Sequence, residues 1–416
     1  MKKIILTTAA LLFAAIILIP MCRAQDARVM TGLEVLRENG FAELKGKRAG
    51  LITNPTGVDH ELRSGVDILF MAPGVRLAAL YGPEHGVRGE YSAGEIIGSA
   101  DDPSTGLRVY SLYGSTRKPT KEMLEGIDVL VYDIQDIGSR SYTFISTMGL
   151  AMEAAAENNI PFIVLDRPNP LGGVRIEGPL VEPGFVSFVS QYPIPYVHGL
   201  TTGELAMLLN GEGLLANGLK CDLKVIRMKG WKREMSFSET GLPWVPSSPH
   251  IPNSLTCLLY PATGIMGELY VASIGVGYTT PFQTFATEWI DADSLANNLN
   301  ELGLPGIRFR PVHYKPYYSV SRGKMVHGVQ IHITDEKIAQ LSLIQFYILQ
   351  EIHKLWPDKD LFGMCEPSRL DMFDKVCGSD RIRKEFTRAY RVESILGLWN
   401  GPANDFRAKA RKYFLY

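Results

Sequence analysis

Short apolar runs alternate with segments of helical spacing along the first half of the chain. Each run is strand-sized, and the runs cover residues 49–53, 66–70, 77–81, 109–112, 129–132, 162–165 and 223–226. Between them, residues 141–158 and 202–210 carry apolar side chains at roughly helical intervals. This alternation predicts an α/β fold in which helices cover a parallel sheet.

The pattern changes after a proline-rich passage from Pro243 to Pro261, which we expect to cross between domains in an extended form. Beyond it, Val329, Ile331 and Ile333 alternate with residues of the opposite face, as in a strand with one buried side. Residues 335–356 then read as one long helix. The sequence therefore predicts a first domain over residues 25–255 and a smaller α+β domain over residues 256–416.

The amino terminus has the form of a signal peptide over residues 1–24. Two lysines precede an apolar run over residues 4–20, and Cys22-Arg23-Ala24 places small residues where cleavage would occur. The run is short for a membrane span, so we expect export, a periplasmic location and no stable membrane insertion after cleavage. A membrane anchor and lipidation at Cys22 are weaker alternatives.

Composition and cysteine spacing exclude some classes of function. The 416 residues carry a formal net charge of −1 and no basic stripe, which argues against a nucleic-acid partner. Neither CxxC nor HExxH occurs, so no zinc site is indicated. Export would permit disulfides, and Cys365 and Cys377 are the best candidate pair, with two separate thiols as the alternative.

Acidic residues follow three of the predicted strands. Glu84 lies in LYGPEHGVRGEY, beside His85 and Arg88 and among three glycines that allow close backbone approach. Asp133 and Asp166 follow two later strands. Because the carboxyl ends of parallel strands meet at one edge of a sheet, these acids should lie close together, where ligands of such sheets bind.

Asp133 and Asp166 each lie in a polar segment. DIQDIGSR adds Gln135, Asp136 and Arg140, and DRPNPLGG adds Arg167 and Asn169. Carboxylates, amides and arginines suit a sugar, because acids transfer protons, amides bind hydroxyls and arginine grips a carboxylate. The same set would suit a metal or a phosphate, and single strand-end acids are often caps or ion-pair partners.

Two further residues complete the candidate site. His198 precedes a predicted helix whose Thr201 and Glu204 have the spacing of a capping box. Glu268 is the one charged residue between Gly264 and Phe282, and we expect it to be either an exposed loop acid or a second carboxylate facing Glu84 across a cleft.

Several motifs, in this order, resemble the exo-β-N-acetylmuramidase NamZ family: LYGPEHGVRGEY, VYDIQDIGSRSYT, VLDRPNPLGG, YPIPYVHGLTTGEL, WVPSSPHIPN and GYTTPF. The resemblance spans nearly the whole mature chain. It implies an exo-acting glycoside hydrolase that removes terminal N-acetylmuramic acid from the non-reducing ends of peptidoglycan fragments. It also implies a Rossmann-like first domain, with a smaller second domain beside the active-site cleft.

Carried over to this chain, the resemblance places the PEHG glutamate at Glu84, with His85 and Arg88 as its neighbours. We expect Glu84 to be the leading catalytic carboxylate, with Glu268, Asp133 or the acetamido group of the substrate itself as its partner. We expect Arg88 or Arg140 to bind the lactyl carboxylate of muramic acid. The resemblance also implies an acid and an arginine where this chain has Ile274 and Val276. Either Glu268 takes the place of the missing acid, or this chain differs in its substrate contacts.

No metal or organic cofactor is expected. Two rival functions remain open, a non-catalytic cell-wall sugar-binding protein and a metal-assisted hydrolase using Asp133 and Asp136.

Overall fold

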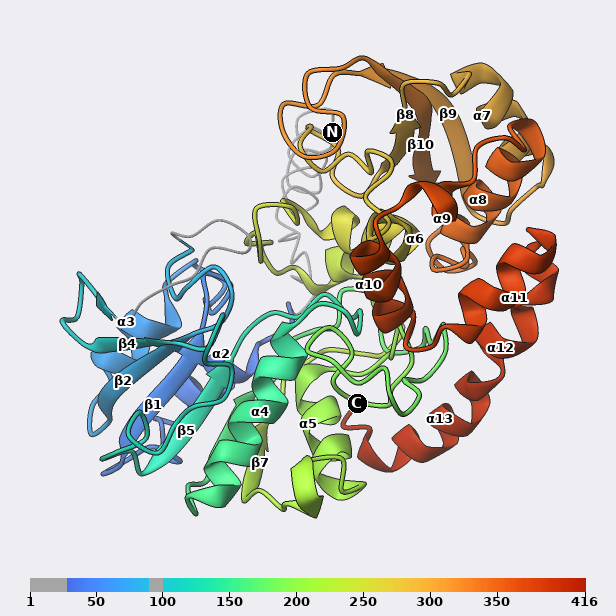
Figure 1. The fold of residues 1–416 in the computed structure, drawn as a ribbon. Coiled ribbons are helices and arrows are strands. Elements are labelled where there is room, and N and C mark those ends of the chain that lie inside the picture. Colours follow the sequence, from blue (N-terminus) through green and yellow to red (C-terminus); the bar gives the residue numbers. More distant parts are fainter. Residues whose placement is uncertain (1–27, 90–99) are drawn as a thin grey trace, which may run out of the picture.

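The computed structural model describes residues 28–89 and 100–416. The expected signal peptide, Cys22, and Glu90 and Tyr91 of the PEHG segment lie outside these residues. The chain forms two lobes, one built around a large sheet and the other around a small one (Figure 1).

Within the described residues, the first lobe holds a seven-stranded sheet in the order β3-β4-β2-β1-β5-β6-β7. All neighbouring strands are parallel except β3 and β4. The strands are β1 (Arg48–Thr53), β2 (Arg76–Gly82), β3 (Ala100–Asp101), β4 (Arg108–Ser111), β5 (Val129–Asp133), β6 (Phe162–Leu165) and β7 (Leu223–Ile226). The predicted parallel α/β fold is confirmed.

Helices cover both faces of this sheet, which explains why its strands read as continuous apolar runs. Val129 and Val131 of β5 face a core shared with α2 (Gly32–Glu38) and α3 (Gly65–Phe70). Leu130 and Tyr132 of the same strand face the opposite core, shared with α4 (Phe144–Glu157) and α5 (Thr202–Gly211). The predicted capping box of α5 is present at Thr201 and Glu204.

One predicted strand is wrong, because residues 66–70 form helix α3. The Ser64 side chain accepts a hydrogen bond from the Val66 amide and so caps the helix. Val66 and Leu69, three positions apart, are buried on one face, whereas Asp67 is partly exposed. An apolar run this short has no periodicity that separates a strand from a helix, and the preceding serine was the available signal.

The second lobe holds an antiparallel sheet in the order β8-β10-β9, with β8 at Thr284–Thr287, β9 at Ile307–Tyr314 and β10 at Val326–Ile333. This confirms the α+β character. Its helices are α6 (Ser254–Gly267), α7 (Ala292–Glu301), α8 (Ile344–Leu355), α9 (Leu361–Met364), α10 (Pro367–Cys377), α11 (Arg381–Ala389) and α12 (Leu396–Asn400). The helix that follows, α13 (Pro402–Ala410), packs against the core of the first lobe through Phe406 and Ala410.

Two boundaries differ from the prediction. The long helix begins at Ile344 rather than at residue 335, because turns occupy the residues before it. The proline-rich passage is not extended to its end, since α6 starts at Ser254 and includes Pro261. The Asn253 cap and the buried Leu259 and Ile265 offset the cost of a proline within the helix, about 3 kcal/mol.

Arg140 joins the two lobes. Its guanidinium donates to the carbonyl oxygens of Pro179 and Ile194 in the first lobe and to those of Val376 and Cys377 at the end of α10. Its Nε donates to the Ser190 hydroxyl, so all five N–H donors of the guanidinium have a partner. Helices α11 to α13 then lead back from the second lobe to the first, where the chain ends (Figure 1).

The predicted pairing of Cys365 with Cys377 is wrong. Cys221, Cys257, Cys365 and Cys377 are all free thiols. Cys377 is fully buried at the end of α10, and the Cys365 thiol donates to the Phe362 carbonyl oxygen instead. Within the described ranges, no helix combines the length and the apolar character that crossing a membrane requires.

Candidate active site

A cavity of about 590 Å³ lies between the lobes, at the carboxyl edge of the large sheet. Its polar lining from the first lobe comprises Glu84, His85, Tyr113, Arg117, Ser141, Thr143, Ser187, Ser248 and His250. The second lobe contributes Glu268, from the end of α6, and Lys375, from α10. The cavity thus brings Glu84 and Glu268 together, as expected if Glu268 is a second carboxylate that faces Glu84 across a cleft.

Glu84 reaches the cavity because it follows β2 within a tight turn. His85 and Gly86 both adopt positive φ, at 76° and 79°, and this turns the chain sharply beyond the strand. The Thr143 hydroxyl, at the start of α4, lies 3.5 Å from Glu84 Oε2. Burial, together with the charge of Glu84 and a hydrogen bond to it, raises the pKa of Tyr113 to about 12, so this hydroxyl stays protonated and can donate to Glu84.

Glu268 enters the cavity from the second lobe. Burial raises its pKa above the usual glutamate value, and Arg369, whose Nη1 lies 3.9 Å from Oε2, only partly opposes this effect. Glu268 also directly follows α6, and the negative end of a helix dipole disfavours a further negative charge. Both effects shift this carboxyl group toward the protonated form, which is the form a general acid needs.

Aromatic rings line the cavity between these two acids. Tyr142 packs edge-on against Phe144 and Tyr260, and Tyr260 packs against Phe282 at 4.8 Å between ring centroids. The Ser141 hydroxyl bonds the hydroxyls of both Tyr196 and Tyr260 and so fixes this wall. An apolar surface flanked by carboxylates suits a pyranose, which has both polar and apolar faces.

Basic side chains occupy other parts of the wall. Arg117 lies over the Phe188 ring, 4.4 Å from its centroid, and the described residues offer it no carboxylate partner. Lys375 is paired with Asp371 at 2.6 Å. His250 bonds the Tyr318 hydroxyl at 2.9 Å, and burial and the charge of His85 lower its pKa, which favours a neutral imidazole.

Asp133 and Arg167 lie outside the cavity, in a buried ion pair. Arg167 donates from Nε and Nη2 to the two carboxylate oxygens of Asp133 at 2.6 and 2.9 Å. This pair fills the crevice between β1 and β5, where the strand order reverses and Rossmann-like folds usually bind ligands. The adjoining cavity has about 20 Å³, which is room for about one water molecule.

The other polar residues of these two segments are internal as well. Gln135 donates to the carbonyl oxygens of Asp136 and Pro168, and Asn169 donates to that of Leu200. Asp136 accepts from the Gly138 amide at 2.6 Å, and its Oδ2 lies 3.8 Å from His198 Nε2.

These contacts hold the strand-end loops beneath the cavity. In the described part of the chain, no group of three or more His, Cys, Asp or Glu side chains is arranged to hold a metal ion.

The two arginines expected to bind a substrate carboxylate have other partners. Arg88 forms ion pairs with Asp102 and Asp67, at 2.9 and 3.1 Å, and these pairs hold the turn that follows Glu84. Arg140 is fully buried, with every donor directed at a protein oxygen. Its contacts make it a tether between the lobes.

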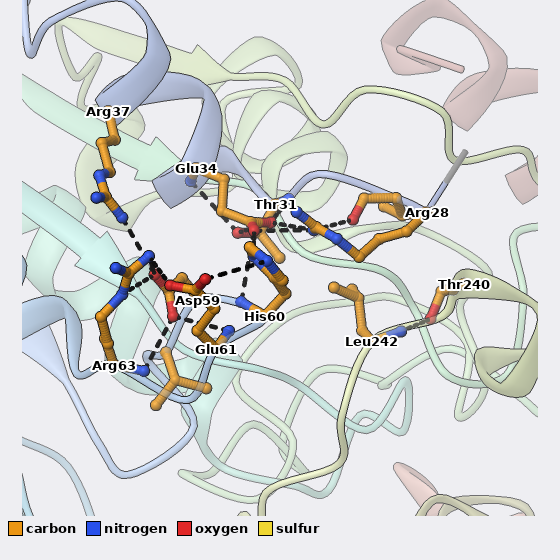
Figure 2. Close-up of polar contacts among 12 residues, drawn as sticks. Arg28, Thr31, Glu34, Arg37, Asp59, His60, Glu61, Arg63, Thr240 and Leu242 are labelled. Atoms are coloured by element: carbon orange, nitrogen blue, oxygen red, sulfur yellow. Dashed lines mark hydrogen bonds and ion pairs between the residues drawn. The ribbon is translucent and has the colours of Figure 1, made fainter. Parts of the chain in front are cut away.

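A separate polar cluster stabilises the first lobe (Figure 2). Its centre is Glu34, which caps α2 with Thr31 and also contacts Arg28 and His60. Burial alone would raise the Glu34 pKa, but these bonds and the Arg28 charge hold it below its usual value. Neighbouring Asp59 binds Arg37 and Arg63. The cluster lies outside the cavity and fastens the loop before α3 to α2.

Many residues of the cavity wall were not predicted from the sequence. Ser141 and Thr143 belong to the SYT motif, and Ser248 and His250 to WVPSSPHIPN, so the family motifs contained them without indicating their roles. Tyr113 and Arg117 follow β4, and the only available signal was the rule that strand ends meet at one edge. Lys375 projects from a distant helix, which no local pattern connects to the site.

Both halves of the chain match models of one protein family. The family model described as exo-beta-N-acetylmuramidase NamZ, N-terminal, matches residues 49–255, and the corresponding C-terminal model matches residues 258–416. A peptidoglycan beta-N-acetylmuramidase NamZ of Bacillus subtilis (strain 168) is 44% identical over 393 residues, which cover 94% of this chain and 92% of that protein.

Two crystal structures of DUF1343 family proteins from Bacteroides fragilis NCTC 9343 have the same fold. One is 58% identical with a TM-score of 0.90, and the other is 28% identical with a TM-score of 0.77. Each match covers 94% of this chain and 99% of the other. Both domain models and a relative aligned along almost the whole length agree, and the chain therefore belongs to the exo-β-N-acetylmuramidase NamZ family.

Proposed function

We propose that this protein releases terminal N-acetylmuramic acid from the non-reducing ends of peptidoglycan fragments, and that the reaction takes place in the cavity between its lobes. The protein is a glycoside hydrolase, as its family membership and its Bacillus relative indicate. The observation that carries the assignment of the site is that Glu84 and Glu268, from different lobes, line one cavity with an aromatic wall.

Glu268 acts as the general acid in this proposal. Its raised pKa makes the protonated form more populated than in an ordinary glutamate at the same pH. Hydrolysis needs that proton on the glycosidic oxygen as the bond to the anomeric carbon breaks. The proton remains with the departing sugar as its new hydroxyl group. Arg369 stays close enough to stabilise the carboxylate that results.

Glu84 is the second catalytic carboxylate. It faces the positive charge that develops at the anomeric carbon, either as a nucleophile or as the base that activates water. Thr143 and the protonated Tyr113 hold it in position. The anomeric configuration of the freshly released product, read by NMR, separates the two roles, because a nucleophile gives retention and a base gives inversion.

Arg117 is the residue that we assign to the lactyl carboxylate of muramic acid. It lines the cavity, and the described residues leave it without a carboxylate partner, whereas Lys375 already pairs with Asp371. A guanidinium can bind a carboxylate through two parallel hydrogen bonds. This assignment replaces Arg88 and Arg140, which bind protein groups instead.

The proposal includes export. Residues 1–24 have the form of a signal peptide, and peptidoglycan lies outside the cytoplasmic membrane. We place the mature protein in the periplasm. Amino-terminal sequencing of protein recovered from the periplasmic fraction should begin near Gln25, and recovery only of full-length protein in the cytoplasm would contradict this location.

A chromogenic β-glycoside of N-acetylmuramic acid tests the activity. Wild-type protein should release the chromophore, Glu84→Gln should lose almost all of this activity, and added chelator should have no effect. Binding of the glycoside without release would favour a sugar-binding protein. Loss of activity on chelation would favour a metal-assisted hydrolase.

A further inference from the structure

Tyrosine side chains gather at the edge of the active-site cavity on the second lobe. Among the described residues, the exposed aromatic side chains are Phe70, Tyr270, Tyr317 and Tyr318, with exposed fractions of 45%, 50%, 70% and 48%. Phe70 lies on α3, whereas the three tyrosines come from the loops that follow α6 and β9. Exposed aromatic rings grouped beside a site usually mark a binding surface.

Two sets of contacts connect these tyrosines to the cavity. The Tyr318 hydroxyl bonds His250, a residue of the cavity wall, at 2.9 Å. On the other side, the Arg369 guanidinium lies over the Tyr270 ring, 4.3 Å from its centroid, and also 3.9 Å from Glu268. The Tyr270 hydroxyl in turn lies 3.4 Å from the Ser319 hydroxyl. The tyrosine group therefore borders the cavity at His250 and, through Arg369, at Glu268.

The two loops hold these rings in a defined arrangement. The Tyr317 amide donates to the Gly277 carbonyl oxygen at 2.8 Å, and the Tyr317 ring stacks with Tyr278, 5.8 Å between centroids. Gly277 has a φ of 90°, and a Cβ there would lie 2.0 Å from the Tyr318 carbonyl oxygen. Only glycine allows the loops to meet this closely.

The backbone of the same loops is strained. Tyr270 and Ser319 have φ values of 60° and 67°, a left-handed conformation that costs non-glycine residues about 1–3 kcal/mol each. Such strain persists where surrounding contacts enforce it, commonly at ligand sites. A solvent-exposed loop with no binding role would have little reason to keep it at these two contacting residues.

We propose that Tyr270, Tyr317 and Tyr318 form a platform that binds the sugar on the leaving-group side of the scissile bond. This inference rests on the proposed function. The general acid donates its proton to the oxygen that departs with the leaving sugar, so that sugar must lie on the Glu268 side. The platform is continuous with this side through Arg369.

The chemistry of the platform fits a β-linked N-acetylglucosamine. The apolar face of a pyranose packs on exposed aromatic rings, and the tyrosine hydroxyls can bond its hydroxyl and acetamido groups. An exo-acting enzyme encloses only the terminal sugar, so the next sugar must extend out of the cavity. The tyrosine platform is the exposed aromatic surface that it would meet there.

Comparison of two substrates tests the platform. The first is the N-acetylmuramyl-N-acetylglucosamine disaccharide, and the second is the p-nitrophenyl glycoside of N-acetylmuramic acid, whose leaving group is not a sugar. We expect Tyr317→Ala to lower kcat/KM on the disaccharide about tenfold more than on the p-nitrophenyl glycoside. Tyr317→Phe keeps the ring but loses the hydroxyl, so its loss on the disaccharide should be smaller than that of Tyr317→Ala. The exposed control Phe70→Ala should stay close to wild type.

If Tyr317→Ala lowered kcat/KM equally on both substrates, or on neither, the proposed platform would be contradicted. A binding measurement separates this result from a failure of the proposed function. Titration of the Glu84→Gln protein with the β-1,4-linked dimer of N-acetylglucosamine should show binding that Tyr317→Ala weakens about tenfold.

If the wild type hydrolysed neither substrate, the proposed function would fail. Dimer binding dependent on Tyr317 would then still support a sugar platform, and absence of this dependence would overturn it.

Discussion

Glu84 and Glu268 line one cavity, although they come from different lobes and approach it from different types of element. Glu84 follows a parallel strand, whereas Glu268 follows a helix. Protein surroundings raise the pKa of Glu268. This arrangement requires the two lobes to keep a fixed relationship, and the Arg140 tether is one of the contacts that hold it.

Replacing Glu268 should make activity depend on the leaving group. Glu268→Gln cannot donate a proton, so kcat on the disaccharide should fall about 100-fold or more, the range expected for a lost general acid. Activity on the p-nitrophenyl glycoside should fall much less, because nitrophenolate departs without protonation. Parallel kinetics on both substrates check this result.

The pH profile provides the control for Glu268. Only the protonated acid is active, so kcat should fall as the pH rises through the raised pKa of Glu268. Glu268→Gln should lack this alkaline limb. If Glu268→Gln kept the alkaline limb, or lost activity equally on both substrates, another group would have to be the general acid.

Arg117 should govern the preference for muramic acid. Arg117→Gln should lower kcat/KM for the p-nitrophenyl glycoside of N-acetylmuramic acid about 10- to 100-fold, which corresponds to about 1.5–3 kcal/mol for a charge-assisted bond. The glycoside of N-acetylglucosamine, which lacks the lactyl group, should be affected little. Lys375→Gln is the matched control and should change this preference less. Loss of preference in Lys375→Gln alone would contradict the assignment.

Arg140 should contribute to stability rather than to substrate binding. Burial lowers its pKa to about 10, and the side chain donates to four carbonyl oxygens, two in the first lobe and two in the second. Arg140→Met should lower the free energy of unfolding by about 3–5 kcal/mol, because these buried carbonyls lose their partner. The exposed Arg388→Met should change it by less than about 1 kcal/mol. Urea denaturation measures both, and an undiminished stability with a weakened affinity for substrate would restore Arg140 as a substrate ligand.

Asp166 should make stability depend on pH. Burial raises its pKa to about 6, although Tyr416, Thr201 and the Gly203 amide all donate to it. Because the folded-state pKa is raised, its contribution is fully present below the usual aspartate pKa and is lost as the pH rises through about 6.

Relative to Asp166→Asn, the wild type should therefore lose about 2–3 kcal/mol of unfolding free energy between pH 4 and pH 7. Denaturation curves at both pH values provide the measurement. Parallel pH dependence in the two proteins would contradict the raised pKa.

The fold followed from the sequence where both faces of a strand are buried. β1, β2, β5 and β6 read as short apolar runs because each packs against helices on both sides. Residues 66–70 have the same composition but form α3, because their surroundings rather than their periodicity decide the conformation. Spacing alone could not decide whether Cys365 and Cys377 form a disulfide, and both are free thiols, one directly after α9 and the other at the end of α10.

The candidate site was predictable only in part. The acids after β2, β5 and β6 do share one sheet edge, but at two of them internal partners take up the carboxylate. Asp133 binds Arg167, and Asp166 binds Tyr416, which arrives from the far end of the chain. Sequence shows that a strand ends in an acid, whereas the distant partner that buries it appears only in the folded protein.

Hydrolysis of the muramic acid disaccharide by wild type, Glu84→Gln, Glu268→Gln and Asp133→Asn shows whether the cavity between the lobes is the catalytic site. Chromatographic quantification of free N-acetylmuramic acid gives the rate. We predict release by the wild type and a loss of at least about 100-fold in both glutamate variants. Asp133→Asn should lose stability, but the protein that remains folded should keep kcat within about tenfold. Full activity in Glu84→Gln or Glu268→Gln would contradict the assignment of the cavity as the catalytic site.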